Sequence, residues 1–244
     1  MSPCAWAALL ASCASAGMLS AADVSGTIVI ERKLTRRSVT APAPAYQRGV
    51  AVELGAIPAQ DPLAFERSHV VVYLEGKPST PVAANASGDS VTIEQQDRQF
   101  VPDLIVVPAG STVSFPNLDA IFHNVFSLSK PRSFDLGNYP KGQTRKIVFP
   151  TPGVVYVYCH LHPNMAASIV ITPNQWSSKV DSDGQFRLAD VPPGKYTAVA
   201  WHKSAGFFRQ TVTVTEQGAP PLHFVIPFAA DPADKSIAKS VTAR

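Results

Sequence analysis

The chain has 244 residues, which is enough for one large or two ordinary domains, and its apolar content of 45% can fill their cores. A formal net charge of only +3 gives no sign of a nucleic-acid-binding groove, so we expect no nucleic-acid partner. The 22 prolines and the scarcity of helical patterns predict an all-β protein with many turns.

The N-terminal segment, residues 1–22, is typical of a secretory signal. It is apolar, contains no charged residue and ends in Ser20-Ala21-Ala22, which predicts cleavage before Asp23. It lacks the usual Lys or Arg near its start. An alternative is a lipoprotein anchored through Cys13, because residues 10–13 fit a bacterial lipoprotein box. No later stretch approaches the 18 apolar residues of a membrane span. We therefore expect a periplasmic protein without a transmembrane segment after signal cleavage.

The cysteines are informative because of this predicted leader. Cys4 and Cys13 both lie in it, so the exported protein keeps only Cys159. One thiol cannot form an internal disulfide, and a free exposed thiol is a liability in an oxidising compartment. A thiolate bound to a metal ion resolves that difficulty.

Two strand patterns precede the middle of the chain, at residues 24–30 and 69–76. Between them, the alternating Ala and Pro residues 41–45 predict an extended linker. A turn signal at residues 76–78 and the small polar run 85–88 indicate a boundary before the next region.

Residues 85–173 form the predicted central domain. Strand patterns recur in it at short spacing, and Pro- and Gly-containing turns separate them. This order of elements matches an eight-stranded Greek-key sandwich. The patterns lie at residues 91–94, 104–107, 112–115, 121–126, 145–149, 154–159 and 168–172.

The segment 159–165 in this domain carries the predicted chemistry. Cys159, His162 and Met165 follow one another at intervals of three residues, and His123 lies upstream. Copper that cycles between Cu(I) and Cu(II) favours a trigonal plane of one Cys and two His, with a weak axial Met. The four residues therefore predict a site for one type 1 copper ion.

Two alternatives to copper follow from the same residues. A buried Cys and a Met near a core commonly serve as apolar filling. Both residues at ligand spacing, with a matching His upstream, would rarely occur by chance, which disfavours that interpretation. Zinc also binds Cys and His, but structural zinc sites rarely use a thioether. Copper fits the whole set best.

Around these residues the chain resembles the cupredoxins, blue-copper proteins of the plastocyanin and amicyanin type, including proteins labelled as methylamine-utilisation proteins. The resemblance spans roughly residues 89–173 and rests on the His123-Asn124 pair and the Cys-x-x-His-x-x-Met loop. It implies that Asn124 ties the two ligand loops together and that Pro163 stiffens the second. It also implies a redox partner such as a c-type cytochrome or a periplasmic dehydrogenase.

A second module surrounds this domain. Residues 181–188, 191–200 and 210–214 resemble the latter half of a carboxypeptidase-regulatory-like, transthyretin-like β-sandwich, and residues 25–30 and 70–76 resemble its first half. We therefore predict a discontinuous sandwich of residues 23–84 and 174–228, with the cupredoxin domain 85–173 inserted. Residues 229–244 have no strand pattern and are expected to form a flexible tail.

The sequence favours an electron carrier over an enzyme. His160 follows Cys159, as in multicopper oxidases, but those enzymes need many His-x-His pairs, and here His160 and His162 form the only pair among six histidines. Since side chains alternate along a strand, His160 should point away from Cys159. No Ser-His-Asp order, phosphate loop or carboxylate pair is evident. A copper-delivery protein and a structural binding module stabilised by copper remain alternatives.

Overall fold

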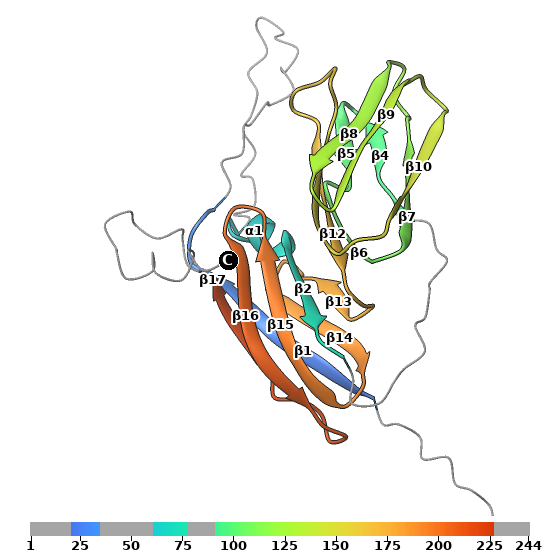
Figure 1. Ribbon diagram of the computed structural model, residues 1–244. Coiled ribbons are helices and arrows are strands. Elements are labelled where there is room, and N and C mark those ends of the chain that lie inside the picture. The colour runs from blue at the N-terminus through green and yellow to red at the C-terminus, as the bar shows by residue number, and fades with distance from the viewer. Residues whose placement is uncertain (1–20, 35–60, 78–90, 227–244) are drawn as a thin grey trace, which may run out of the picture.

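The computed structural model describes residues 21–34, 61–77 and 91–226 and confirms the all-β prediction (Figure 1). Its described helix, α1 (Ala64–Ser68), has five residues. No helix in the described ranges is long and apolar enough to cross a membrane. Residues 1–20 of the predicted leader, the predicted tail and the predicted boundary at residues 84 and 85 lie outside these ranges.

One sandwich combines both ends of the described chain. Its sheets have the strand orders β14-β1-β17 and β13-β2-β15-β16. The strands of this sandwich are β1 (Ala22–Ile30), β2 (Val70–Glu75), β13 (Ser177–Lys179), β14 (Gln185–Val191), β15 (Gly194–His202), β16 (Gly206–Val214) and β17 (Leu222–Ile226).

Long-range pairing joins this sandwich across the middle of the chain. β2 pairs antiparallel with β15, with Val72 opposite Ala200, and also with β13. β1 pairs with β14 and, in parallel, with β17. Alternate residues of β1 are buried, as a strand with one face on a core requires.

A second sandwich lies within residues 91–172. Its two main sheets have the orders β10-β7-β3 and β6-β12-β11-β8-β9, and β4 and β5 form a hairpin. The strands are β3 (Val91–Thr92), β4 (Glu94–Gln96), β5 (Gln99–Val101), β6 (Leu104–Pro108), β7 (Ser111–Pro116), β8 (His123–Ser129), β9 (Arg132–Tyr139), β10 (Thr144–Phe149), β11 (Gly153–Tyr158) and β12 (Ala166–Thr172).

Two strand predictions in this sandwich need correction. Residues 91–94 form parts of two strands, because β3 pairs with β7 whereas β4 pairs with β5. The strand predicted at residues 121–126 begins only at His123. Ile121 and Phe122 are exposed, and the Asn117 side chain donates a hydrogen bond to the Ile121 carbonyl, so this segment is a loop.

The two sandwiches meet over a small apolar cluster of their own. Trp201 and Tyr73, from β15 and β2, pack with Leu104 and Val170, from β6 and β12. At its edge, Nε2 of His69 lies 3.1 Å from Oδ1 of Asp103. The His69 ring lowers the pKa of Asp103 despite partial burial of the carboxyl. An apolar contact and a polar contact therefore both link the two sandwiches.

A fully buried polar pair joins α1 to the end of β15. Nε2 of His202 is 3.1 Å from Oε2 of Glu66, but the two atoms are not aligned well enough for a hydrogen bond. The Ser204 amide donates to Nδ1 of His202, so the proton of the neutral ring is on Nε2, facing Glu66. Burial lowers the pKa of His202 although Glu66 opposes that change.

Gly26 allows β1 and β17 to pair closely. A Cβ atom at this position would overlap the backbone carbonyl oxygen of Leu222. We expect Gly26→Ala to lower the free energy of unfolding by about 1–3 kcal/mol, as overpacking does. Ser25→Ala, at an exposed neighbouring position, is the control. Equal denaturation midpoints for both variants would contradict the tight contact.

The buried His202 should make stability depend on pH. The unfolded ring has a pKa of about 6.5, and the folded value is lower. The His202 ring therefore leaves the free energy of unfolding unchanged above about pH 6.5. Below that pH it lowers the free energy of unfolding, by at most about 1.4 kcal/mol per pH unit. Melting temperatures from pH 8 to 5 should fall less steeply for His202→Gln than for the exposed control His223→Gln. Equal slopes would contradict this prediction.

The division of the chain into an inserted domain, residues 85–173, and a discontinuous host remains a prediction. Because each sandwich has its own core, we expect replacement of residues 85–173 by a short flexible linker to leave a cooperatively folded host. Circular dichroism during thermal unfolding measures this. A host that is unfolded, while residues 85–173 fold alone, would count against an independent discontinuous sandwich.

Candidate metal centre

The predicted ligands lie at one end of the five-stranded sheet. His123 is the first residue of β8, and Cys159 directly follows β11, which pairs with β8 through Tyr158 and Phe126. His162 belongs to the loop between β11 and β12, and Met165 immediately precedes β12. The strand pairing therefore brings two loops together that are 36 residues apart in sequence at His123 and Cys159.

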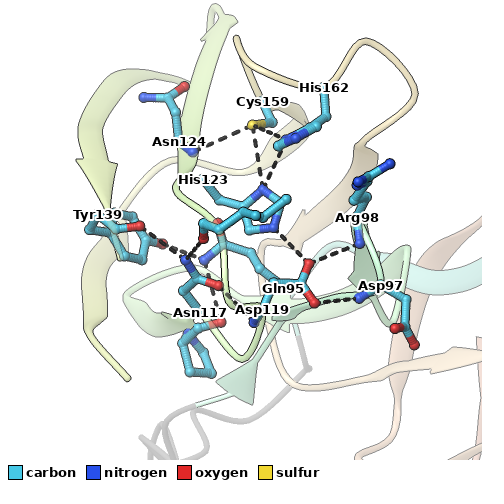
Figure 2. Close-up of polar contacts among 12 residues, drawn as sticks. Gln95, Asp97, Arg98, Asn117, Asp119, His123, Asn124, Tyr139, Cys159 and His162 are labelled. Atoms are coloured by element: carbon cyan, nitrogen blue, oxygen red, sulfur yellow. Dashed lines mark hydrogen bonds and ion pairs between the residues drawn. The ribbon is translucent and has the colours of Figure 1, made fainter. Parts of the chain in front are cut away.

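Three ligand atoms converge at this end of the sheet (Figure 2). Nδ1 of His123 lies 3.0 Å from Nδ1 of His162. Sγ of Cys159 lies 4.0 Å from the first nitrogen and 3.7 Å from the second. His123 and Cys159 are buried, and His162 is partly exposed. Within the described residues, these three side chains form the one cluster of His, Cys, Asp or Glu that could hold a metal ion.

These separations fit one small metal ion. Bond lengths of about 2.0 Å to nitrogen and about 2.3 Å to sulfur place trigonal ligand atoms about 3.5–3.7 Å apart. The observed values of 3.0, 3.7 and 4.0 Å scatter around that range. A donor set of two imidazoles and one thiol suits copper or zinc. The residues present therefore fit a metal.

Met165 and Pro163 occupy different environments in the same loop. Met165 is 1% exposed and belongs to the same core cluster as Cys159, and its amide donates to the His162 carbonyl. Pro163 is exposed beside His162. Met165 is thus a buried residue of the loop that carries His162, and its role as an axial ligand remains a prediction.

Asn124 connects the two ligand loops through its backbone and its side chain. Its amide N–H points to Sγ of Cys159 at 3.4 Å, and its Oδ1 accepts from the His160 amide at 3.4 Å. Its Nδ2 donates to Asp135 at 2.7 Å. Asp135 therefore fixes the Asn124 side chain, a role that the sequence did not indicate.

Asp119 is a further residue that sequence reasoning missed. Its Oδ2 lies 2.7 Å from Nε2 of His123, and the amides of Asp97 and Arg98 donate to its two carboxylate oxygens. Burial opposes the charged form, but hydrogen bonds from Arg98, His123 and Asp97 outweigh burial and lower the pKa of Asp119. The carboxylate is therefore ionised at neutral pH.

Burial also affects the second imidazole. Desolvation, followed by the neighbouring His123 and Arg98, lowers the pKa of His162 below its usual value. A lower pKa favours the neutral ring, and only the neutral ring has a lone pair to offer a metal. The side chain is thus prepared for metal binding at neutral pH.

A buried polar network lies behind His123. Nε2 of Gln95 lies 2.6 Å from the Tyr139 hydroxyl, which donates to the Phe115 carbonyl. Asn117 donates to the Tyr139 carbonyl and accepts from the Asp119 amide. These contacts fix the loop that carries Asp119 and His123.

His160 points away from the ligand atoms. Its ring stacks on Phe126 with centroids 3.7 Å apart, and its Nε2 lies 3.7 Å from Asp135. The predicted strand 154–159 ends at Tyr158, so His160 lies beyond β11, and its ring is half-exposed. It is therefore not one of the three converging groups.

This chain has only limited similarity to known proteins. A family model described as polysaccharide lyase family 4, domain II, matches residues 142–220, a stretch that includes strands of both sandwiches. A search of curated proteins returned no match.

The matching solved structures include cupredoxins. A copper-containing nitrite reductase from Thermus scotoductus SA-01 is 26% identical, with a TM-score of 0.34; the match covers 39% of this chain and only 25% of that one. A purple cupredoxin from Nitrosopumilus maritimus is 22% identical, with a TM-score of 0.31 and coverages of 34% and 100%. An amicyanin variant in the Cu(I) state is 20% identical, with a TM-score of 0.33 and coverages of 41% and 98%. Because all three scores are below 0.5, the case for copper rests on the side chains themselves.

Proposed function

We propose that this protein is an exported type 1 copper protein of the cupredoxin class that carries single electrons between redox partners. The observation that carries the proposal is the convergence of two imidazole nitrogens and one thiol within 4.0 Å of one another at one end of a β-sandwich. The donor set distinguishes copper from zinc only when Met165 is included, since a buried thioether favours copper.

The residues of the site have separate tasks in this proposal. His123, Cys159, His162 and Met165 would hold the ion. When bound, copper supplies one-electron exchange between its two common oxidation states. The Asn124 amide N–H donates toward the Cys159 sulfur and so helps to hold it in place.

The arrangement supports carrying electrons rather than transforming a substrate. Four protein ligands leave no open position on the metal for a substrate to enter. Cys159 follows a strand held on both sides, by β8 and β12, which keeps the thiol in place. Little movement of the ligands means little reorganisation during electron exchange.

The exposed edge of the site offers a contact surface. His162 is partly exposed, and Leu161 beside it is 46% exposed. Phe122 and Leu118, from the loop before His123, add further exposed apolar side chains. Small apolar contacts suit brief encounters between redox proteins. We propose a c-type cytochrome or a periplasmic dehydrogenase as the partner, and the periplasm as the compartment.

The metal assignment predicts a colour. Copper-loaded protein should absorb intensely in the visible range through thiolate-to-Cu(II) charge transfer and should bleach on reduction. Cys159→Ser should be colourless. His160→Gln is the matched control, and it should stay coloured because this ring stacks on Phe126 instead. Stoichiometric zinc that resists exchange by copper would refute the assignment.

The carrier assignment predicts where electrons leave. Leu161→Glu should slow reduction of an oxidised c-type cytochrome by at least about tenfold without changing the visible spectrum. Leu128→Glu is the control, because Leu128 is 82% exposed and lies five residues beyond His123 in β8. Stopped-flow absorbance measures both rates. Transfer of copper instead of electrons to an apo-acceptor within the same time would show a copper-delivery protein.

A further inference from the structure

Asp119 receives hydrogen bonds from two separate parts of the chain. Its Oδ2 accepts from Nε2 of His123 at 2.7 Å and from the Arg98 amide at 2.9 Å. Its Oδ1 accepts from the Asp97 amide at 2.8 Å. Figure 2 shows the carboxylate between the imidazole ring and the two amides.

The two amides belong to the tip of the β4–β5 hairpin. Gln96 pairs with Gln99, so Asp97 and Arg98 form a two-residue turn. Both residues have positive φ angles, 53° and 57°, as a type I′ turn requires. Successive amides in such a tight turn can face the same anion. The turn thus presents two donors to one carboxylate.

The hairpin is also attached to the loop that carries His123. The Leu118 amide donates to the Gln95 carbonyl at 2.9 Å, and Gln95 and Asn117 form an isolated parallel β-bridge. The carboxylate therefore cannot move far relative to β4. A fixed acceptor on one side of the His123 ring determines which ring nitrogen carries the proton.

This geometry has one chemical consequence for His123. An ionised carboxylate can accept hydrogen bonds but cannot donate them, so Nε2 of His123 must carry the proton. Nδ1 then has its lone pair directed at Nδ1 of His162 and Sγ of Cys159. The tautomer needed for metal binding is set by Asp119 before any metal arrives.

We infer that Asp119 is a positioning residue of the metal centre. It holds His123 in the metal-binding tautomer and contributes a negative charge, and the Asp97-Arg98 turn holds Asp119 in place. The inference deepens the proposed function and rests on it. The alternative is that Asp119 serves only to fasten the hairpin, with its contact to His123 incidental.

The charge has a predictable direction. A fixed anion near the site stabilises the more positive oxidation state of a bound metal relative to the less positive one. Removing the charge should therefore favour the reduced form. Asp119→Asn removes the charge but leaves one oxygen that can accept from His123, whereas Asp119→Ala removes charge and acceptor together.

A matched control is available in the same turn. The Asp97 side chain is exposed, and Asn tolerates a positive φ angle. Asp97→Asn therefore removes the same unit of charge close by without altering the acceptor of His123. A general effect of net charge would appear equally in Asp97→Asn and Asp119→Asn.

The first measurement uses the metal-free protein. Nitrogen NMR of ¹⁵N-histidine-labelled wild-type protein should show His123 protonated on Nε2, and Asp119→Asn should keep that tautomer. Asp119→Ala should show a mixture of both tautomers. A wild-type His123 protonated on Nδ1 would overturn the inference. This readout does not need copper, so a failure to bind copper would refute the proposed function without deciding the role of Asp119.

The second measurement uses the copper-loaded protein. Asp119→Asn should shift the reduction equilibrium about tenfold toward the reduced form, which is about 59 mV for a one-electron couple. Asp97→Asn should shift it by less than about twofold. Copper affinity should fall about 10–100-fold in Asp119→Ala. Equal shifts in the two Asn variants, or unchanged affinity in a folded Asp119→Ala protein, would show that Asp119 only fastens the hairpin.

Discussion

The pairing of β11 with β8 is the constraint on which the candidate centre depends. It joins Tyr158 to Phe126 and so brings Cys159 beside the start of β8, where His123 is buried. A buried thiol and a buried imidazole are costly without partners. Here each faces the other and His162, so a metal ion would satisfy all three groups at once. The rest of the site serves to keep these side chains in that position.

Polar contacts extend outward from the ligands in two directions. On one side, Asn124 links the Cys159 sulfur to Asp135 on β9. On the other, Asp119 links His123 to the β4–β5 turn. Both carboxylates have pKa values below the ordinary range, because amides donate to both and the His123 imidazole also donates to Asp119. Each ligand loop is therefore held by an ionised side chain as well as by strand pairing.

The sequence indicated the candidate ligands more readily than the residues that support them. Cys159, His162 and Met165 share a short loop, so their proximity follows from covalent spacing. Asp119 lies four residues before His123 in a loop, where no helical period would have drawn attention to it. The contacts of residues 94–101 with this loop are long-range and leave no local pattern. The all-β class followed from strand patterns, whereas the start of β8 depended on the side-chain bond from Asn117 to Ile121.

The most direct test of the account is X-ray absorption at the copper edge of the copper-loaded protein. It reports the atoms bound to the metal without reference to colour or activity. A copper centre built on His123, Cys159 and His162 predicts two nitrogen neighbours at about 2.0 Å and one sulfur at about 2.3 Å, with the sulfur absent in Cys159→Ser. A first shell of nitrogen and oxygen only in the wild-type protein would contradict a copper centre built on Cys159.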